Sequence, residues 1–264
     1  MAVALAFETL GEGPPVVILH GLFGAGRNWT QLAQALAAHY RVYLPDARNH
    51  GASPWSDSMS YTDMAQDVAA LIEREGLQQP FVLGHSMGGK TAMALALAQP
   101  QAIAGLVVVD IAPEAYADQF SSYVGAMRSL DVTAAGSRRE LQQALAASLG
   151  PSAPVDFLLQ NLQRHNERFD WRMNLLAAGM CMGELCGFPK ALQQGCYDGP
   201  ALFVSGADSD YVRPGSAAGI RAMFPHAELQ SIADAGHWVH ADQPAALLCA
   251  LQDWLDDACT AAAR

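Results

Sequence analysis

A serine flanked by glycines gives the clearest indication of chemistry in this chain. Residues 84–89 read G-H-S-M-G-G, which centres Ser86 in a G-x-S-x-G pattern. The apolar run 81–83 predicts a buried strand before it, and a helix is predicted over 86–98 directly after it. A sharp strand-to-helix turn exposes its central hydroxyl above the sheet, beside free N–H groups at the start of the helix. The flanking glycines fit because side chains there would collide with neighbouring backbone. We therefore predict that Ser86 is a nucleophile.

A nucleophilic serine needs a base, and the chain has eight histidines. With this type of turn, the order along the chain is serine, acid, histidine. His237 lies in the loop D-A-G-H-W, after a strand predicted to end near Ile232, which brings it to the carboxyl edge of the sheet. His226 precedes that strand and falls at the opposite edge, while His240 is predicted to be a neighbour or a surface residue. We predict that His237 is the general base.

Two places in the chain could supply the acid. The loop after the predicted strand 201–205 reads G-A-D-S-D-Y-V, where the usual acid position falls on Ser209 between Asp208 and Asp210. Asp110 ends the predicted strand 106–109 at the same edge of the sheet and could reach the same histidine. We favour Asp110 as the acid with Ser209 assisting it, and keep Asp208 or Asp210 as the alternative.

A glycine-rich loop follows the first buried strand and reads H-G-L-F-G-A-G over residues 20–26. Such a loop can direct the Leu22 N–H toward the nucleophile, and the Met87 N–H follows Ser86 directly. Together they are predicted to stabilise the oxyanion of a tetrahedral intermediate. The loop lacks the Lys and Ser/Thr of a phosphate-binding loop, which argues against that reading. His20 is expected to hold the loop in place.

Apolar runs alternate with helix-period segments along most of the chain. Strands are predicted at 16–20, 40–44, 81–84, 106–109, 201–205 and 227–232, and helices at 28–38, 61–75, 86–98, 216–223 and 244–257. This alternation is typical of a parallel sheet with helices on both faces. We expect an α/β core formed by 1–112 and 200–264. Residues 113–199 contain helical pieces and no strong strand, so they are predicted to form a helical lid or cap. Candidate pocket residues there are Phe120, Tyr123, Met127, Trp171 and Met180.

Composition excludes several classes of protein. The chain has 264 residues, of which 51% are hydrophobic and 16% charged, so a sizeable core is expected. A net charge of −11 argues against nucleic acid as a partner. No apolar run approaches the ~18 residues of a membrane span, so no integral membrane association is expected. The N-terminus has no basic leader and is predicted to form a strand. Five cysteines without metal-ligand spacing indicate reduced thiols in the cytoplasm, with no metal and no cofactor.

Several strings resemble one known group of proteins. They are H-G-L-F-G at 20–24, D-A-R-N-H-G-x-S-P at 46–54, G-H-S-M-G-G-K at 84–90, V-D-I-A-P at 109–113 and A-G-H-W-V-H-A at 235–241. They resemble the α/β-hydrolase superfamily, and within it the bacterial YbfF esterases and the eukaryotic abhydrolase domain-containing protein 11 group. The resemblance implies a mostly parallel eight-stranded sheet with a helical lid. It also implies hydrolysis of carboxylic esters, in some bacterial members of acyl-CoA thioesters, and an acid at Asp110 paired with Ser209.

The predicted function is that of a serine hydrolase acting on a small-molecule ester or thioester through an acyl-enzyme. C–C bond hydrolysis or perhydrolysis on the same fold is one alternative. The other is a homologue that binds ligands without catalysis. Basic residues of the insertion could meet a CoA phosphate or belong to solvated helix faces: Arg128, Arg138, Arg139, Arg164, Arg168 and Arg172. The oligomeric state is left open.

Overall fold

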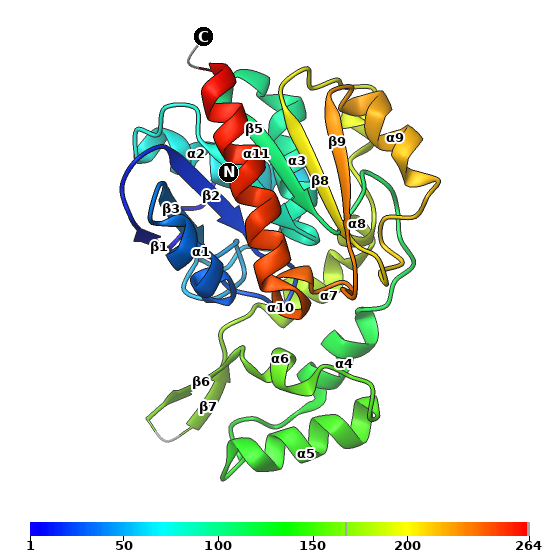
Figure 1. Cartoon of the computed structure of the whole chain (residues 1–264). Coiled ribbons are helices and arrows are strands. Elements are labelled where there is room, and N and C mark those ends of the chain that lie inside the picture. The colour runs from blue at the N-terminus through cyan, green and yellow to red at the C-terminus, as the bar shows by residue number, and fades with distance from the viewer. Residues whose placement is uncertain (167, 263–264) are drawn as a thin grey trace.

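The computed structural model describes residues 1–166 and 168–262 and shows a twisted central sheet (Figure 1). Seven strands form it, in the order β1-β3-β2-β4-β5-β8-β9. Their bounds are β1 Phe7–Leu10, β2 Pro15–Leu19, β3 Arg41–Pro45, β4 Phe81–His85, β5 Gly105–Val109, β8 Ala201–Gly206 and β9 Ala227–Ile232. Strand β1 pairs antiparallel with β3, and every other pairing in this sheet is parallel. The mostly parallel sheet is confirmed; within the described residues it has seven strands, where the resemblance implied eight.

Helices cover both faces of the sheet. Their bounds are α1 Thr30–Leu36, α2 Tyr61–Arg74, α3 Met87–Ala98, α9 Ser216–Met223, α10 Val239–Asp242 and α11 Pro244–Ala262. Because successive strand residues point to opposite faces, Phe81 and Leu83 pack with α1 and α11, whereas Val82 packs with α2 and α3. Buried side chains on both faces explain why these strands appear as continuous apolar runs.

Local chemistry sets the helix boundaries. Helix α2 begins where the Ser60 hydroxyl accepts a hydrogen bond from the Asp63 N–H at 3.1 Å, the usual arrangement of an N-cap. The helix predicted over 28–38 is shorter, because a 3₁₀ turn, Gly26–Trp29, precedes α1. Helix α11 ends at Ala262, beyond the predicted end at residue 257. No helix within the described ranges has both the length and the apolar character needed to cross a bilayer.

The segment between β5 and β8 lies mainly at one end of the molecule, beneath the sheet in Figure 1. It contains α4 Ser121–Ser129, α5 Arg138–Leu149, α6 Val155–Leu159, α7 Leu175–Met180 and α8 Met182–Cys186. It also contains an antiparallel hairpin, β6 Leu162–His165 and β7 Arg168–Trp171. The sequence shows no strong strand candidate in this segment, and the hairpin was therefore not predicted. These strands carry mostly polar, partly exposed residues, so the sequence lacks the apolar run that marks a buried strand.

Candidate active site

Ser86 lies at the turn between β4 and α3 in a conformation that side chains rarely adopt. Its φ is +52° and its ψ is −118°. The turn brings backbone segments so close that a Cβ on Gly84 would lie 2.1 Å from the Gly88 carbonyl oxygen. A Cβ on Gly88 would lie 2.3 Å from the Leu19 carbonyl oxygen. The fold therefore requires the glycines of the G-x-S-x-G pattern for steric reasons.

Three side chains from separate parts of the sheet edge form a hydrogen-bonded series. Nε2 of His237 lies 3.0 Å from the Ser86 hydroxyl oxygen. Nδ1 of the same ring lies 2.8 Å from Oδ2 of Asp110. Asp110 directly follows β5, and its side chain is fully buried. The arrangement can accept the serine proton at Nε2 while the carboxylate orients the ring through Nδ1.

The Asp110 carboxylate is held by the last residue of β8 and by the loop after it. The Gly206 N–H donates to Oδ1 at 3.0 Å, and the Ser209 hydroxyl donates to Oδ2. Asp208 and Asp210 on either side of Ser209 are exposed, and neither hydrogen-bonds to His237. The structure therefore brings Asp110 to the histidine and leaves the two alternative acids in solvent.

The glycine-rich loop after β2 reaches the same place. Neither the Leu22 N–H nor the Met87 N–H donates to another described residue, so both are free for a ligand. His20 holds the loop as expected: Nδ1 bonds to the Gly21 carbonyl at 2.8 Å, and Nε2 accepts from the Ala47 N–H at 2.9 Å. Burial lowers the pKa of His20, consistent with a neutral ring that donates through one nitrogen and accepts through the other.

Two amide side chains tie this loop to the insertion, a contact that the sequence did not reveal. Nδ2 of Asn161 and Nε2 of Gln160 donate to the Phe23 carbonyl at 2.8 and 3.0 Å. Phe23 has a φ of +63° and follows Leu22 directly. The insertion therefore fixes the backbone that carries one of the two free N–H groups.

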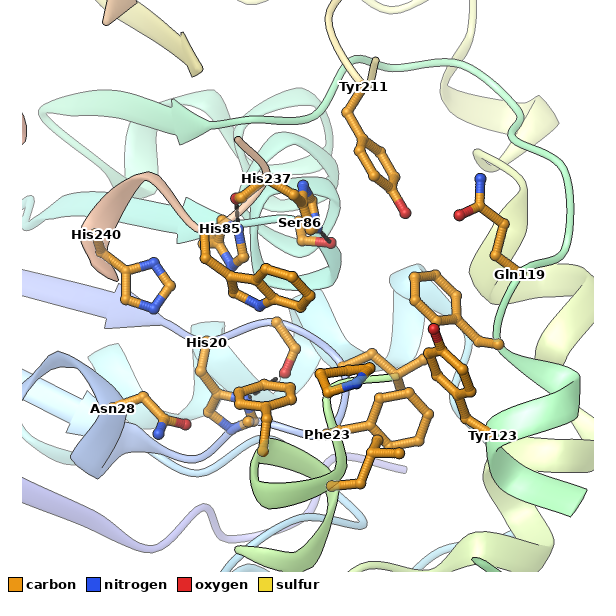
Figure 2. A pocket seen from close by; sticks show the side chains of 18 of the residues that line it. His20, Phe23, Asn28, His85, Ser86, Gln119, Tyr123, Tyr211, His237 and His240 are labelled. Carbon is orange, nitrogen blue, oxygen red and sulfur yellow. Dashed lines mark hydrogen bonds between the residues drawn. The ribbon is translucent and has the colours of Figure 1, made fainter. Parts of the chain in front are cut away.

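A cavity of about 210 Å³ opens beside Ser86 and His237 (Figure 2). Its walls combine aromatic residues of the core and the insertion, including Phe23, Phe120, Tyr123, Phe157 and Trp238. Two of the candidate pocket residues, Phe120 and Tyr123, thus line it. The other three do not: Met127 is buried in the main core, Met180 is 76% exposed, and Trp171 packs against the main core. None of the described residues that line the cavity is a Lys or an Arg.

Aromatic rings pack around the candidate base, and no pattern in the sequence predicts this packing. Tyr211 stacks on His237, with ring centroids 3.9 Å apart and planes 21° apart. Nε2 of His85 bonds to the His237 carbonyl at 2.8 Å. His240, expected as a neighbour or a surface residue, stacks on Trp29 with ring centroids 4.4 Å apart and lines the cavity. Burial lowers the pKa of His85 well below its usual range and that of His240 to about 4.

Comparison with known proteins agrees with this architecture. A family model described as alpha/beta hydrolase fold matches residues 14–244. The chain belongs to the alpha/beta hydrolase family. It is 39% identical over 251 residues to the mouse sn-1-specific diacylglycerol lipase ABHD11, a match that covers 92% of this chain and 79% of that protein. It is 34% identical over 244 residues to the esterase YbfF of Escherichia coli, covering 92% and 93% of the two chains.

Solved structures lead to the same family. A marine microorganism esterase superposes with a TM-score of 0.92 at 35% identity, covering 96% of this chain and all of that one. Among these similar proteins are esterases and a lipase, and the chain is accordingly a hydrolase of this family. Within residues 1–166 and 168–262, no group of three or more His, Cys, Asp or Glu side chains is arranged to hold a metal ion.

Proposed function

We propose that this hydrolase cleaves carboxylic esters with Ser86 as nucleophile, His237 as general base and Asp110 as acid. The observation that carries the proposal is the pair of short contacts on one imidazole ring. Nε2 of His237 lies 3.0 Å from the Ser86 hydroxyl, and Nδ1 lies 2.8 Å from the Asp110 carboxylate. This is the geometry that general-base activation of a serine requires.

The proposed reaction has two steps. His237 accepts the Ser86 proton as the serine oxygen bonds to the ester carbonyl carbon, and the N–H groups of Leu22 and Met87 stabilise the oxyanion. The protonated His237 then donates that proton to the departing alcohol oxygen, which leaves an acyl group on Ser86. Water attacks the acyl-enzyme by the same route, with His237 as its base. This step releases the carboxylic acid and restores the serine.

The cavity favours a simple ester over a CoA thioester. Its walls are mainly aromatic and aliphatic, and no Lys or Arg lines it to meet a phosphate. The six arginines considered from the sequence are absent from the lining. Thioester cleavage would use the same residues and stays a secondary expectation. We also propose that residues 113–199 act as the lid, because Phe120, Tyr123 and Phe157 of that segment line the cavity.

The test is hydrolysis of p-nitrophenyl esters with acyl chains from two to sixteen carbons, with acyl-CoA substrates in parallel. Ser86→Ala should lower ester turnover by about 10³-fold or more and abolish labelling by a fluorophosphonate. Wild-type protein that is folded, inactive on every ester and unlabelled would contradict the proposal. That result would favour the ligand-binding alternative. Labelling without ester turnover would favour C–C bond hydrolysis or perhydrolysis.

The cytoplasm stays the predicted location. All five cysteines carry free thiols, and two of them, Cys196 and Cys249, are exposed. Unpaired exposed thiols are typical of reducing compartments. Fractionation of the source cells with an antibody to the chain would test this expectation.

A further inference from the structure

Tyr211 is fixed beside the candidate base by contacts of its own backbone. Its N–H donates to the Ser209 hydroxyl oxygen at 3.2 Å, and its carbonyl accepts from the Tyr116 hydroxyl at 2.7 Å. Tyr116 is in turn tied to the segment that follows β5, because its hydroxyl accepts from the Ala112 N–H at 2.9 Å. The Tyr211 ring is therefore held against His237 at 3.9 Å by the same loop that holds Asp110.

The hydroxyl of Tyr211 extends from that ring into the cavity (Figure 2). The carboxamide of Gln119 borders the same cavity, and in this view it points toward the Tyr211 hydroxyl. Within the described part of the chain, neither group has a side-chain hydrogen-bond partner. Burial raises the pKa of Tyr211 to about 12, so its hydroxyl keeps its proton and can donate at neutral pH.

These two polar groups stand among apolar walls. Phe120 directly precedes α4 and Tyr123 lies in it, and the Phe23 ring packs against both, with ring centroids 6.0 and 6.4 Å apart. A polar group that a ligand covers without a hydrogen bond costs free energy, whereas one that the ligand satisfies contributes favourably. The pair therefore discriminates between ligands that present a donor or acceptor at this place and ligands that present only methylenes.

The position of His237 shows which part of an ester would meet this pair. Its Nε2 must reach the departing alcohol oxygen to protonate it, so the alcohol side of the substrate lies next to the imidazole. Tyr211 stacks on that imidazole, and its hydroxyl consequently borders the alcohol side. The carbonyl oxygen of the ester lies toward the free N–H of Leu22.

We propose that Tyr211, together with Gln119, is a specificity-determining residue that selects esters whose alcohol carries a further hydrogen-bonding group. A hydroxyl, carbonyl or amide two or three carbons from the ester oxygen is the class of substituent that fits. This inference rests on the proposed ester hydrolysis and specifies its substrate. The tyrosine ring positions His237, while the hydroxyl forms a hydrogen bond with the polar group of the alcohol.

The experiment uses matched pairs of butyrate esters that differ by one hydroxyl in place of a methyl group. One pair is 2-hydroxyethyl butyrate and propyl butyrate, and the other is 3-hydroxypropyl butyrate and butyl butyrate. Hydrolysis is followed by titration of the released butyric acid. The readout is the ratio of kcat/KM for the hydroxylated ester to kcat/KM for its alkyl partner. Any intrinsic difference in reactivity is the same for every variant, so changes in the ratio report recognition alone.

Tyr211→Phe keeps the stacked ring and removes only the hydroxyl. The ratio should fall by about three- to tenfold relative to wild type for at least one pair, the range of a single neutral hydrogen bond. Gln119→Leu should lower it by about two- to threefold, because this side chain is also exposed to solvent. Tyr197→Phe is the matched control and should keep the wild-type ratio. The Tyr197 hydroxyl is buried away from the cavity and has no hydrogen-bond partner within the described chain.

A ratio in Tyr211→Phe within twofold of wild type for both pairs would overturn the inference. An unchanged ratio in Gln119→Leu would overturn the part assigned to Gln119. Both results leave ester hydrolysis itself intact. The proposed function fails separately, if wild type hydrolyses none of the four esters and a fluorophosphonate does not label Ser86.

Discussion

The Ser209 hydroxyl donates a hydrogen bond to Asp110 Oδ2, the same carboxylate oxygen that faces Nδ1 of His237. The two residues are 99 positions apart and come from the ends of neighbouring strands β5 and β8. Ser209 occupies the loop position where the acid usually falls. It therefore contributes a donor to the carboxylate of the adjacent strand.

Substitution of the acid should separate Asp110 from the exposed aspartates. Asp110→Asn is expected to lower kcat by about 10³- to 10⁴-fold, because an amide cannot stabilise the imidazolium that forms on His237. Ser209→Ala should lower kcat by about tenfold, as expected for the loss of one hydrogen bond to a charged group. Asp208→Asn and Asp210→Asn are the controls, since both side chains are exposed. Steady-state kinetics of all four variants on one ester would test this assignment. A large loss of kcat in Asp208→Asn or Asp210→Asn would indicate that the acid lies in the loop after β8 instead.

Asn161 should affect turnover more than substrate binding. Asn161→Ala removes the 2.8 Å hydrogen bond to the Phe23 carbonyl, which lies next to the proposed oxyanion donor Leu22. Because that donor acts mainly in the transition state, kcat should fall about tenfold while KM changes less. Gln163→Ala, on β6 and away from the cavity, is the matched control. Equal kinetics for the two variants would rule out a role of Asn161 in positioning the loop.

Two glycines should respond in opposite ways to an added methyl group. Gly88→Ala places a Cβ 2.3 Å from the Leu19 carbonyl and should prevent correct folding or lower the melting temperature strongly. Gly125 lies within α4, and a Cβ there meets nothing within 4 Å. Gly125→Ala should stabilise the protein by about 0.5–1 kcal/mol, because alanine favours the helix. Thermal unfolding measures both. Similar melting temperatures for the two variants would contradict the close approach at the nucleophile turn.

Buried histidines should make the fold sensitive to acid. Burial, reinforced by the nearby His20, lowers the pKa of His50 from 6.5 to about 3. Below pH 6.5 the unfolded chain takes up a proton at this residue and the folded protein does not, so stability falls as the pH falls. His50→Leu should remove about 1.4 kcal/mol per pH unit from the slope of the unfolding free energy between about pH 6 and pH 4. Urea denaturation at several pH values tests this. His39→Leu, at an exposed site, is the control and should keep the wild-type slope. If the unfolding free energy of His50→Leu depends on pH in the same way as that of wild type, the prediction is wrong.

The sequence predicted the parts of the molecule that depend on local pattern. Ser86 and the strand before it were recognisable because the steric demands of the turn leave a fixed pattern of glycines. The core strands were recognisable from apolar runs buried on both faces. The hairpin β6–β7 was missed because its polar, partly exposed strands carry no such run. Tyr211 and Asn161 were missed because their contacts join loops that are distant in the chain, and no spacing rule connects such positions.

The proposed acid follows β5, whereas the loop 207–215 follows β8. This separation matters for the evolution of such enzymes and for their engineering. Asp110 is anchored at the end of β5, next to the strand that carries the nucleophile. The loop 207–215 therefore need not supply the carboxylate, and beyond Ser209 its sequence can vary without loss of the acid. A combinatorial library in this loop that keeps Ser209 and an aromatic ring at position 211 should alter the choice of alcohol while leaving the proposed acid in place. The proposed acid and the residue proposed to select the alcohol are therefore encoded in different segments of the chain.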